Sequence, residues 1–206
     1  MRSSRLGTES VAGRSGVPSG KAGMGSRVSQ PELIRREAVY EGKMITVYRD
    51  TLRNADGSEM LREVVIHPDS VAVVAVSDDD EVVLVRQYRH PVGAELLELP
   101  AGLMDEPDES PLQVAQRELA EETGLSADAW LVLLQQHPTP GMSNEQVCIY
   151  LAQGLHPAEG EHKRDPDEDL EVVRMPFATA VQEVRDGRIT NGLAVAGLLA
   201  LADMRT

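Results

Sequence analysis

The stretch RELAEETGL, residues 117–125, places three carboxylates within five residues of one predicted helix. On a helix, Glu118 lies one turn from both Glu121 and Glu122, and such like-charged pairs cost about 0.2–0.5 kcal/mol each. All three also lie near the helix C-terminus, where the helix dipole disfavours negative charge. These three unfavourable placements indicate that the site holds a counter-charge.

The residues flanking this stretch predict a helix over 111–123. Ser110 is a favoured N-cap, Pro111 suits the first helical position, and Gln113 can complete a capping box. Gly124 is a typical helix stop. At about 100° per residue, one apolar stripe of this helix must face the core, and the three glutamates lie along the shoulder of that stripe.

Two interpretations of the glutamates follow from their spacing alone. Hard divalent cations such as Mg²⁺ bind carboxylate and carbonyl oxygens, so the cluster can be a metal site. It can also be a solvated acidic helix face braced by Arg117, because glutamate is common on helix surfaces. The spacing leaves both interpretations open.

The rest of the chain predicts a mixed sheet with helices on its faces. Short apolar and β-branched runs predict strands at 43–52, 59–66, 71–76, 81–89, 94–100, 130–136, 146–153 and 170–176. Helical spacing recurs at 177–187 and at 192–204, and Gly187 is a natural stop for the first of these helices. This pattern predicts an α/β or α+β sandwich.

Composition divides the chain into three parts. Residues 1–30 are rich in Ser, Gly and Arg and predict a disordered tail, 31–70 predict a small N-terminal β-region, and 71–206 predict the main domain. The formal net charge of −14 makes a nucleic-acid partner unfavourable, and no apolar run is long enough for a membrane span. The single cysteine, Cys148, fits a reducing cytoplasm.

The segment from Gly102 to Leu125 resembles the Nudix box of the Nudix hydrolases. In that pattern a glycine is followed after five residues by Glu, and then after seven residues by Arg-Glu, an apolar residue, any residue, Glu-Glu, any residue, Gly and an apolar residue. Here every position from Glu109 onward matches, and one extra residue separates Gly102 from Glu109. The positions of the box are Gly102, Glu109, Arg117, Glu118, Glu121, Glu122 and Gly124. The resemblance covers roughly 40–205 and implies the Nudix fold.

The flanking segments at 85–102 and 138–152 resemble the ADP-ribose pyrophosphatase branch of this family. Pro140, fifteen residues past Leu125, accompanies ADP-ribose specificity in that branch. The resemblance implies that a cytoplasmic homodimer, with Mg²⁺ or Mn²⁺, hydrolyses the diphosphate of ADP-ribose to AMP and ribose 5-phosphate. It also implies that the N-terminal strands, within 31–70, reach the partner's site. A hydrolase of another nucleotide sugar and a non-catalytic Nudix-like ligand sensor are the alternatives.

The resemblance also implies roles for the residues of the box. Glu118, Glu121 and Glu122 would bind the metal, together with the main-chain oxygen of Ala101. Arg117 would orient one of these glutamates. A metal held in this way would neutralise phosphate charge and acidify the attacking water.

Beyond the box, the loop 141–146 contains one acid, and we expect this loop to be mobile because it includes Gly141 and Ser143. In the ADP-ribose branch the catalytic base lies on a mobile loop after the box. Glu145 is therefore the candidate that positions or deprotonates the water. The predicted catalytic residues are Glu145, Glu121 and Arg117.

Candidate substrate-binding residues lie mainly before the box. Arg62 and Arg89 suit the diphosphate, because a guanidinium binds phosphate oxygens in a planar fork. Glu98 can accept hydrogen bonds from adenine or ribose, and Met104 completes the set. An adenine-stacking ring would come from Tyr40, Tyr48 or Tyr88, among which the sequence does not choose.

Overall fold

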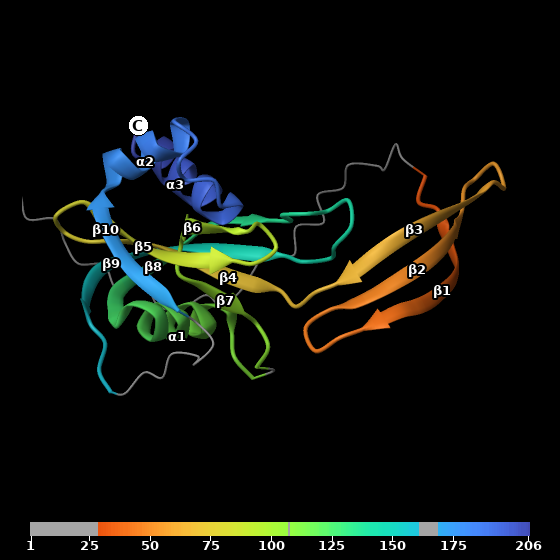
Figure 1. The fold of residues 1–206 in the computed structure, drawn as a ribbon, viewed down its shortest axis with the longest axis horizontal. Helices are drawn as coiled ribbons and strands as arrows, with labels where there is room; N and C mark the ends of the chain where they lie inside the picture. The colour runs from red at the N-terminus through yellow and green to blue at the C-terminus, as the bar shows by residue number, and fades with distance from the viewer. Residues whose placement is uncertain (1–28, 107, 161–168) are drawn as a thin grey trace, which may run out of the picture.

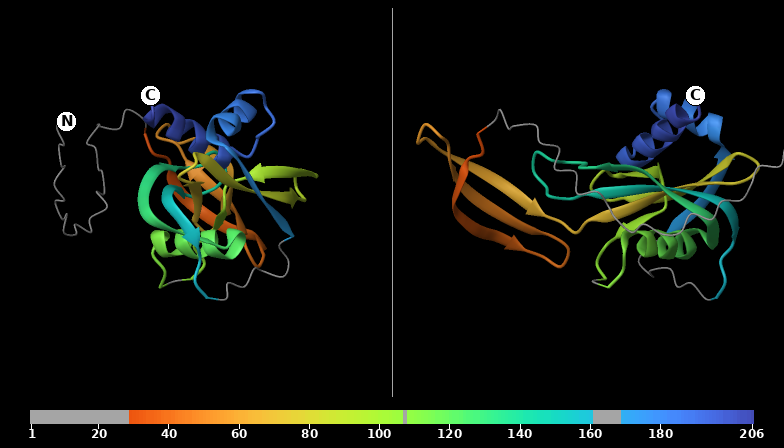
Figure 2. Two further views of the ribbon diagram at one scale, coloured as in Figure 1. Left: turned by 90° about the vertical axis from the view of Figure 1, so that its left-hand side faces the viewer. Right: turned by 180° about the vertical axis from the view of Figure 1, so that it is seen from behind.

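The computed structural model describes residues 29–106, 108–160 and 169–206, which form two β-sheets and three helices (Figure 1). Most of the predicted disordered tail, 1–30, lies outside the described residues. A three-stranded sheet projects from one side of a larger body that holds a seven-stranded sheet and the helices (Figures 1 and 2). The mixed sheet flanked by helices and the small N-terminal β-region confirm the predicted fold class.

The N-terminal sheet contains β1 (Glu32–Glu41), β2 (Thr46–Arg53) and β3 (Glu59–Ile66), which pair antiparallel in that order. The predicted turn between β2 and β3 forms at Asp56-Gly57, where Gly57 has a φ of 84° that favours glycine. The sequence does not predict β1. All ten residues of this strand are exposed, so it lacks the alternation that marks a half-buried strand.

An ion pair ties β1 to β2. Arg36 donates from Nε and Nη2 to the two carboxylate oxygens of Asp50, at 2.8 and 2.7 Å, and Asp50 is buried. The Arg36 guanidinium also lies 4.8 Å from the ring centre of Tyr48. The pKa of Asp50 is lowered because the hydrogen bonds from Arg36 outweigh burial, which raises it. The pair therefore stabilises the sheet when Asp50 is ionised.

The larger sheet has the strand order β10-β5-β4-β9-β8, and β6 pairs with β5 while β7 pairs with β4. Its strands are β4 (Ser70–Val76), β5 (Glu81–Arg89), β6 (Ala94–Glu98), β7 (Ala101–Leu103), β8 (Leu125–Gln136), β9 (Val147–Pro157) and β10 (Leu170–Pro176). β4 and β9 run parallel, and the other pairs run antiparallel. The sheet is therefore mixed.

The bounds of several strands differ from the prediction, most clearly at two places. The predicted strand 94–100 corresponds to β6, and the separate strand β7 follows Pro100, since proline cannot donate to a strand ladder. β8 begins at Leu125 rather than at Trp130, because its pairing with β9 continues through Ser126. At this point tertiary pairing outweighs the weak strand propensity of the local sequence.

Helices cover both faces of the larger sheet. α1 (Pro111–Thr123) packs on one face, and α2 (Phe177–Arg185) and α3 (Gly192–Met204) pack on the other (Figures 1 and 2). β4 is buried along its whole length. Its side chains alternate between two cores, with Val71 in the core under α1 and Val74 in the core under α2 and α3. The result is a three-layer sandwich.

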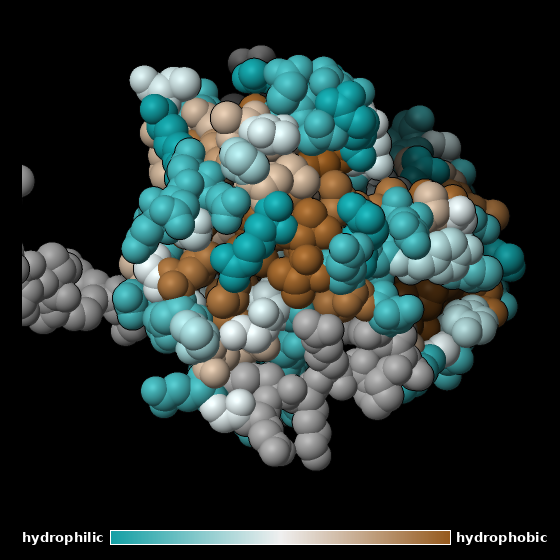
Figure 3. Space-filling view, turned by 60° about the vertical axis from the view of Figure 1, so that its left-hand side comes forward, coloured by the Kyte–Doolittle hydropathy of each residue, from teal (hydrophilic) through white to brown (hydrophobic). Residues whose placement is uncertain are grey.

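The surface of the larger body is mixed in character. Seen from its left-hand side, hydrophobic residues reach the surface between hydrophilic ones (Figure 3). In the described part of the chain, no helix combines the length and the apolar character needed to cross a membrane.

Candidate active site

α1 is fixed at both ends as the sequence predicts. The N–H of Gln113 donates to Ser110 Oγ, and the N–H of Ser110 donates to Gln113 Oε1 at 2.9 Å, which completes the capping box. Gly124 ends the helix in the left-handed region with a φ of 70°. Val114 and Leu119 are fully buried against the sheet. The helix is therefore held under the sheet, with its glutamates toward its C-terminal end.

β7 lies directly against the carboxylate of Glu118. Gly102 pairs with Val71, so its Cα faces the α1 side of the sheet. A Cβ on Gly102 would lie 2.0 Å from Glu118 Oε1 and 2.6 Å from Glu118 Cγ. The Glu118 side chain is only 12% exposed and passes where that Cβ would be. This close approach explains why the segment requires glycine at its start.

Glu122 joins the helix to the turn before β7. It is 4% exposed, and its Oε2 accepts a hydrogen bond from the N–H of Ala101 at 3.1 Å. The N–H of Val73 donates to the carbonyl of Pro100 at 2.8 Å and fixes the same turn to β4. The turn therefore brings the main chain of Ala101, the predicted carbonyl ligand, next to a buried carboxylate.

Arg117 lies at the centre of a carboxylate network. Its Nη1 donates to Glu118 Oε1 at 2.7 Å and to Glu121 Oε2 at 3.2 Å, and its Nε donates to Glu109 Oε2 at 3.1 Å. Burial lowers the pKa of the guanidinium, but the charge of Glu118 and the hydrogen bonds with Glu109 and Glu121 outweigh it, so this pKa is raised. Glu109 joins the network despite the extra residue that precedes it.

The donor set of this site fits a divalent cation. Glu109, Glu118 and Glu121 bind one guanidinium, and the buried carboxylate of Glu122 lies on the same helix beside Ala101. All the donors are hard oxygens, which Mg²⁺ and Mn²⁺ prefer. Within the described ranges, no three His, Cys, Asp or Glu side chains already converge on one point, and Glu118 and Glu121 both bind Arg117. A cation would therefore compete with Arg117 for these two carboxylates.

Arg89 and Glu98, which the sequence predicts as separate substrate contacts, bind each other. Arg89 Nη2 donates to Glu98 Oε2 at 2.6 Å, and Arg89 Nε lies 3.0 and 3.2 Å from the two carboxylate oxygens. The Glu98 side chain is 4% exposed, and a buried carboxylate needs such a partner, whereas the Arg89 side chain is 45% exposed. In the sequence, Glu98 lies three residues before Ala101, whose N–H donates to Glu122.

Glu145 lies on the loop between β8 and β9 and contacts the start of β4. Its Oε1 accepts a hydrogen bond from Ser70 Oγ at 2.9 Å and lies 3.8 Å from His67 Nδ1. The loop was expected to be mobile, but hydrogen bonds anchor it to residues 65–70. By strand alternation, Ser70 belongs to the α2 and α3 side of β4, opposite to the side that Gly102 faces. The described hydrogen bond of the Glu145 carboxylate goes to Ser70, and its catalytic role stays a prediction.

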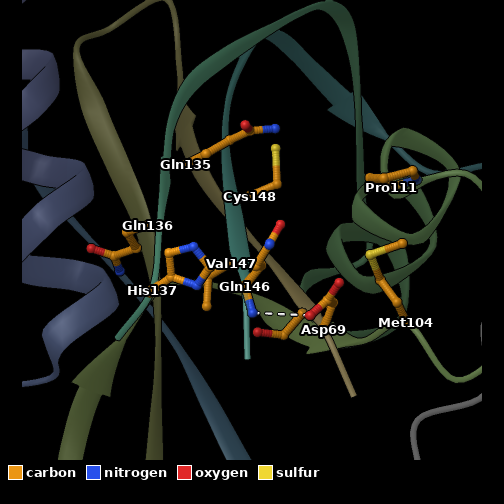
Figure 4. A pocket seen from close by; sticks show the side chains of 10 residues that line it. Asp69, Met104, Pro111, Gln135, Gln136, His137, Gln146, Val147 and Cys148 are labelled. Atoms are coloured by element: carbon orange, nitrogen blue, oxygen red, sulfur yellow. Dashed lines mark hydrogen bonds between the residues drawn. The ribbon is translucent and has the colours of Figure 1, made fainter. Parts of the chain in front are cut away.

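Met104 lines a cavity of about 200 Å³ near the N-terminus of α1 (Figure 4). Met104 and Pro111 form one side, and Gln135, Gln146 and Cys148 lie opposite (Figure 4). Among the described residues, neither a lysine nor an arginine lines this cavity. Its amides can both donate and accept hydrogen bonds, so it suits a neutral polar group better than a phosphate. Nothing in the sequence marks these glutamines, because neutral residues in or beside strand-like runs carry no catalytic pattern.

Arg62 lies on β3 of the N-terminal sheet, away from α1 (Figure 1). Its Nη1 donates to the carbonyl of Leu61 at 2.9 Å. It also lines a groove of about 550 Å³ together with Arg49 and Met142. Within one described chain, the structure does not bring Arg62 to the α1 glutamates.

The NUDIX domain model matches residues 66–192, a span that contains β7, α1 and the whole Arg117 network. This chain belongs to the Nudix family. The matched span contains the carboxylate cluster of α1, and the extra residue before Glu109 does not remove the chain from the family. Nearly all of the N-terminal sheet precedes the matched span.

Three known proteins resemble this Nudix chain over most of their length. An ADP-ribose pyrophosphatase of Mycobacterium tuberculosis is 40% identical over 175 residues, which cover 85% of this chain and 84% of that protein. A methanol dehydrogenase activator of Bacillus methanolicus is 31% identical and covers 82% of this chain and 91% of that protein. An ADP-ribose pyrophosphatase of Bacillus subtilis is 32% identical, and the alignment covers 78% of this chain and 86% of that protein.

A solved structure described as an ADP compounds hydrolase shares the Nudix architecture. It superposes on this chain with a TM-score of 0.77 at 26% sequence identity. The alignment covers 87% of this chain and 96% of the other. This alignment is longer than the 66–192 span, so the similarity extends beyond the Nudix domain itself.

Proposed function

We propose that this Nudix protein is a metal-dependent hydrolase that splits the diphosphate of ADP-ribose into AMP and ribose 5-phosphate. The observation that carries the proposal is the α1 site, where Arg117 binds three glutamates of the box, Glu122 binds the turn at Ala101, and Glu118 packs directly on Gly102. Two relatives named ADP-ribose pyrophosphatase support the substrate class.

Each residue of the α1 site has a distinct task in this proposal. Glu118, Glu121, Glu122 and the main-chain oxygen of Ala101 would hold Mg²⁺ or Mn²⁺. When bound, the ion neutralises phosphate oxygens and lowers the pKa of the attacking water. Arg117 orients the glutamates beside it through its hydrogen bonds. The two caps of α1 keep this geometry fixed.

The charged and neutral parts of the substrate would bind in different places. Arg89 binds the diphosphate, and Glu98 holds its guanidinium in place, since the buried carboxylate is already engaged by Arg89. The cavity beside Met104 takes the neutral terminal ribose. Its helix residue, Pro111, lies two helical turns before Glu118, which is about 10 Å along the axis. That separation suits one sugar attached to a diphosphate.

Glu145 is our candidate for the group that positions or deprotonates the water. In this role its loop must release Ser70, because the carboxylate is hydrogen-bonded there. A Glu145→Gln variant should then lose about 10²-fold or more in kcat. Full turnover in this variant would move the role to another acid. The segment 161–168, which lies outside the described residues, contains Glu161, Asp165, Asp167 and Glu168.

We also propose a cytoplasmic homodimer that forms through the N-terminal sheet. β1 is exposed along its whole length, and Leu33 and Tyr40 are 48% and 57% exposed. An exposed strand with apolar side chains is a typical surface for protein–protein contact. A partner copy would then bring its Arg62 toward the α1 site. The buried free thiol of Cys148 is compatible with a reducing compartment.

The deciding experiment measures Mg²⁺-dependent AMP release from ADP-ribose, other nucleotide sugars and dinucleotides. We expect the highest kcat/KM with ADP-ribose and loss of turnover when EDTA removes the metal. A clear preference for another nucleotide sugar would replace the substrate but not the chemistry. Calorimetric binding of ADP-ribose without metal-dependent turnover of any compound would instead identify a non-catalytic sensor.

A further inference from the structure

The two sheets are joined by a short connector, His67, Pro68 and Asp69, between β3 and β4. Asn144, on the loop between β8 and β9, binds both main-chain polar groups of His67. The N–H of His67 donates to Asn144 Oδ1 at 2.9 Å, and Asn144 Nδ2 donates to the carbonyl of His67 at 3.3 Å. One amide side chain thus occupies the point where the chain leaves the N-terminal sheet.

The main chain of the same loop runs along the end of β3. The N–H of Val65 donates to the carbonyl of Met142 at 2.8 Å, and the N–H of Asn144 donates to the carbonyl of Val65 at 3.4 Å. Val65 and Ser143 form a parallel β-bridge. The loop therefore adds a short strand-like segment to the N-terminal sheet.

The loop also holds the other end of the connector. The N–H of Ser70 donates to the carbonyl of Gln146 at 3.0 Å, and the N–H of Gln146 donates to Asp69 Oδ1 at 2.9 Å. The strands of the N-terminal sheet pack chiefly on one another. The loop between β8 and β9 is therefore hydrogen-bonded to both ends of the connector that joins the two sheets.

We propose that Asn144 is a positioning residue that sets the orientation of the N-terminal sheet relative to the Nudix sheet. The amide is suited to this task because it donates and accepts at once, as the main chain of His67 requires. Asn144 is an exposed residue, so removing its side chain leaves the core intact. Its consequence for substrate binding rests on the proposed function, in which the N-terminal sheet supplies Arg62.

Amide hydrogen exchange on the full chain tests the contact between Asn144 and His67 without any assay of activity. In Asn144→Ala, exchange at His67 should accelerate about 2- to 10-fold, the range expected for one lost hydrogen bond. Asn144→Asp keeps an oxygen that accepts from the His67 N–H, so it should retain most of this protection. Asn54→Ala is the matched control, because the Asn54 amide binds Ser58 in an exposed turn of the same sheet. Unchanged exchange at His67 in Asn144→Ala would overturn the proposal.

Steady-state kinetics with ADP-ribose and Mg²⁺ test whether the orientation matters for the reaction. We expect Asn144→Ala to raise KM about 2- to 10-fold while kcat stays within about twofold, and Asn54→Ala to change neither. Faster exchange at His67 with an unchanged KM would overturn the role in substrate binding. If the wild type hydrolyses none of the compounds, the proposed function fails, and the exchange data still decide the role of Asn144.

Discussion

Gly102→Ala tests whether the carboxylate of Glu118 must lie where β7 now allows it. The added Cβ would lie 2.0 Å from Glu118 Oε1, whereas ordinary contact begins near 3.4 Å, so the carboxylate must retreat by the difference, about 1.4 Å. A displacement of about 1 Å at a reacting site can lower the rate on the order of 10²-fold. We therefore expect kcat/KM for ADP-ribose to fall about 100-fold.

The fold should survive this substitution. The clash is with a flexible side chain rather than with backbone, and overpacking of this kind costs about 1–3 kcal/mol, or about 2–12 °C in Tm for a chain of this size. Gly192→Ala is the matched control, because a Cβ there meets nothing within 4 Å. Thermal unfolding and Mg²⁺-dependent hydrolysis are measured on both variants. Wild-type turnover by Gly102→Ala would refute the argument that Glu118 needs this position.

Three further predictions concern other parts of the molecule. Arg117→Gln should lower kcat about 10- to 100-fold without weakening Mg²⁺ binding, since it removes both the orienting contacts and a competing charge. Calorimetry and kinetics together check this, and an unchanged kcat would contradict it. Gln135→Leu should raise KM for ADP-ribose, because it removes an amide that lines the cavity beside Met104. An unchanged KM in this variant would contradict the ribose site. The folded pKa of Asp50 lies below its ordinary value of 3.8, so its pair with Arg36 stabilises the fold above that pH, and this stabilisation is lost as pH falls through the lowered pKa. Asp50→Asn should therefore be less stable at neutral pH and lose less stability in acid, and urea unfolding curves that shift in parallel with the wild type would contradict this.

The sequence predicts those elements whose ends and burial are set by residues within the element itself or next to it. The helix 111–123 was predicted with its observed bounds, because Ser110, Pro111 and Gly124 fix a helix wherever it packs. The β-branched run at 71–76 marked the buried central strand for the same kind of reason. The spacing of Glu109, Arg117 and the glutamates likewise predicted the family, which the domain match confirms.

The parts that depend on pairing between distant residues could not be predicted. β1 is exposed throughout, so no burial pattern distinguishes it from a loop. Glu98 carries no sign in the sequence that its partner is Arg89 on the adjacent strand. The loop with Glu145 contains residues typical of mobile segments, yet Ser70, 75 positions earlier, holds it in place. In each case the deciding contact is tertiary.

The separation of 77 positions between His67 and Asn144 has a consequence for synthesis on the ribosome. At about 5–20 residues per second, the N-terminal sheet is complete roughly 4–15 s before the loop that fixes it has been made. During that interval β1, β2 and β3 can already pair, because their contacts are local in sequence. Their orientation relative to the rest of the protein is therefore decided late, by a segment translated only after the Nudix box.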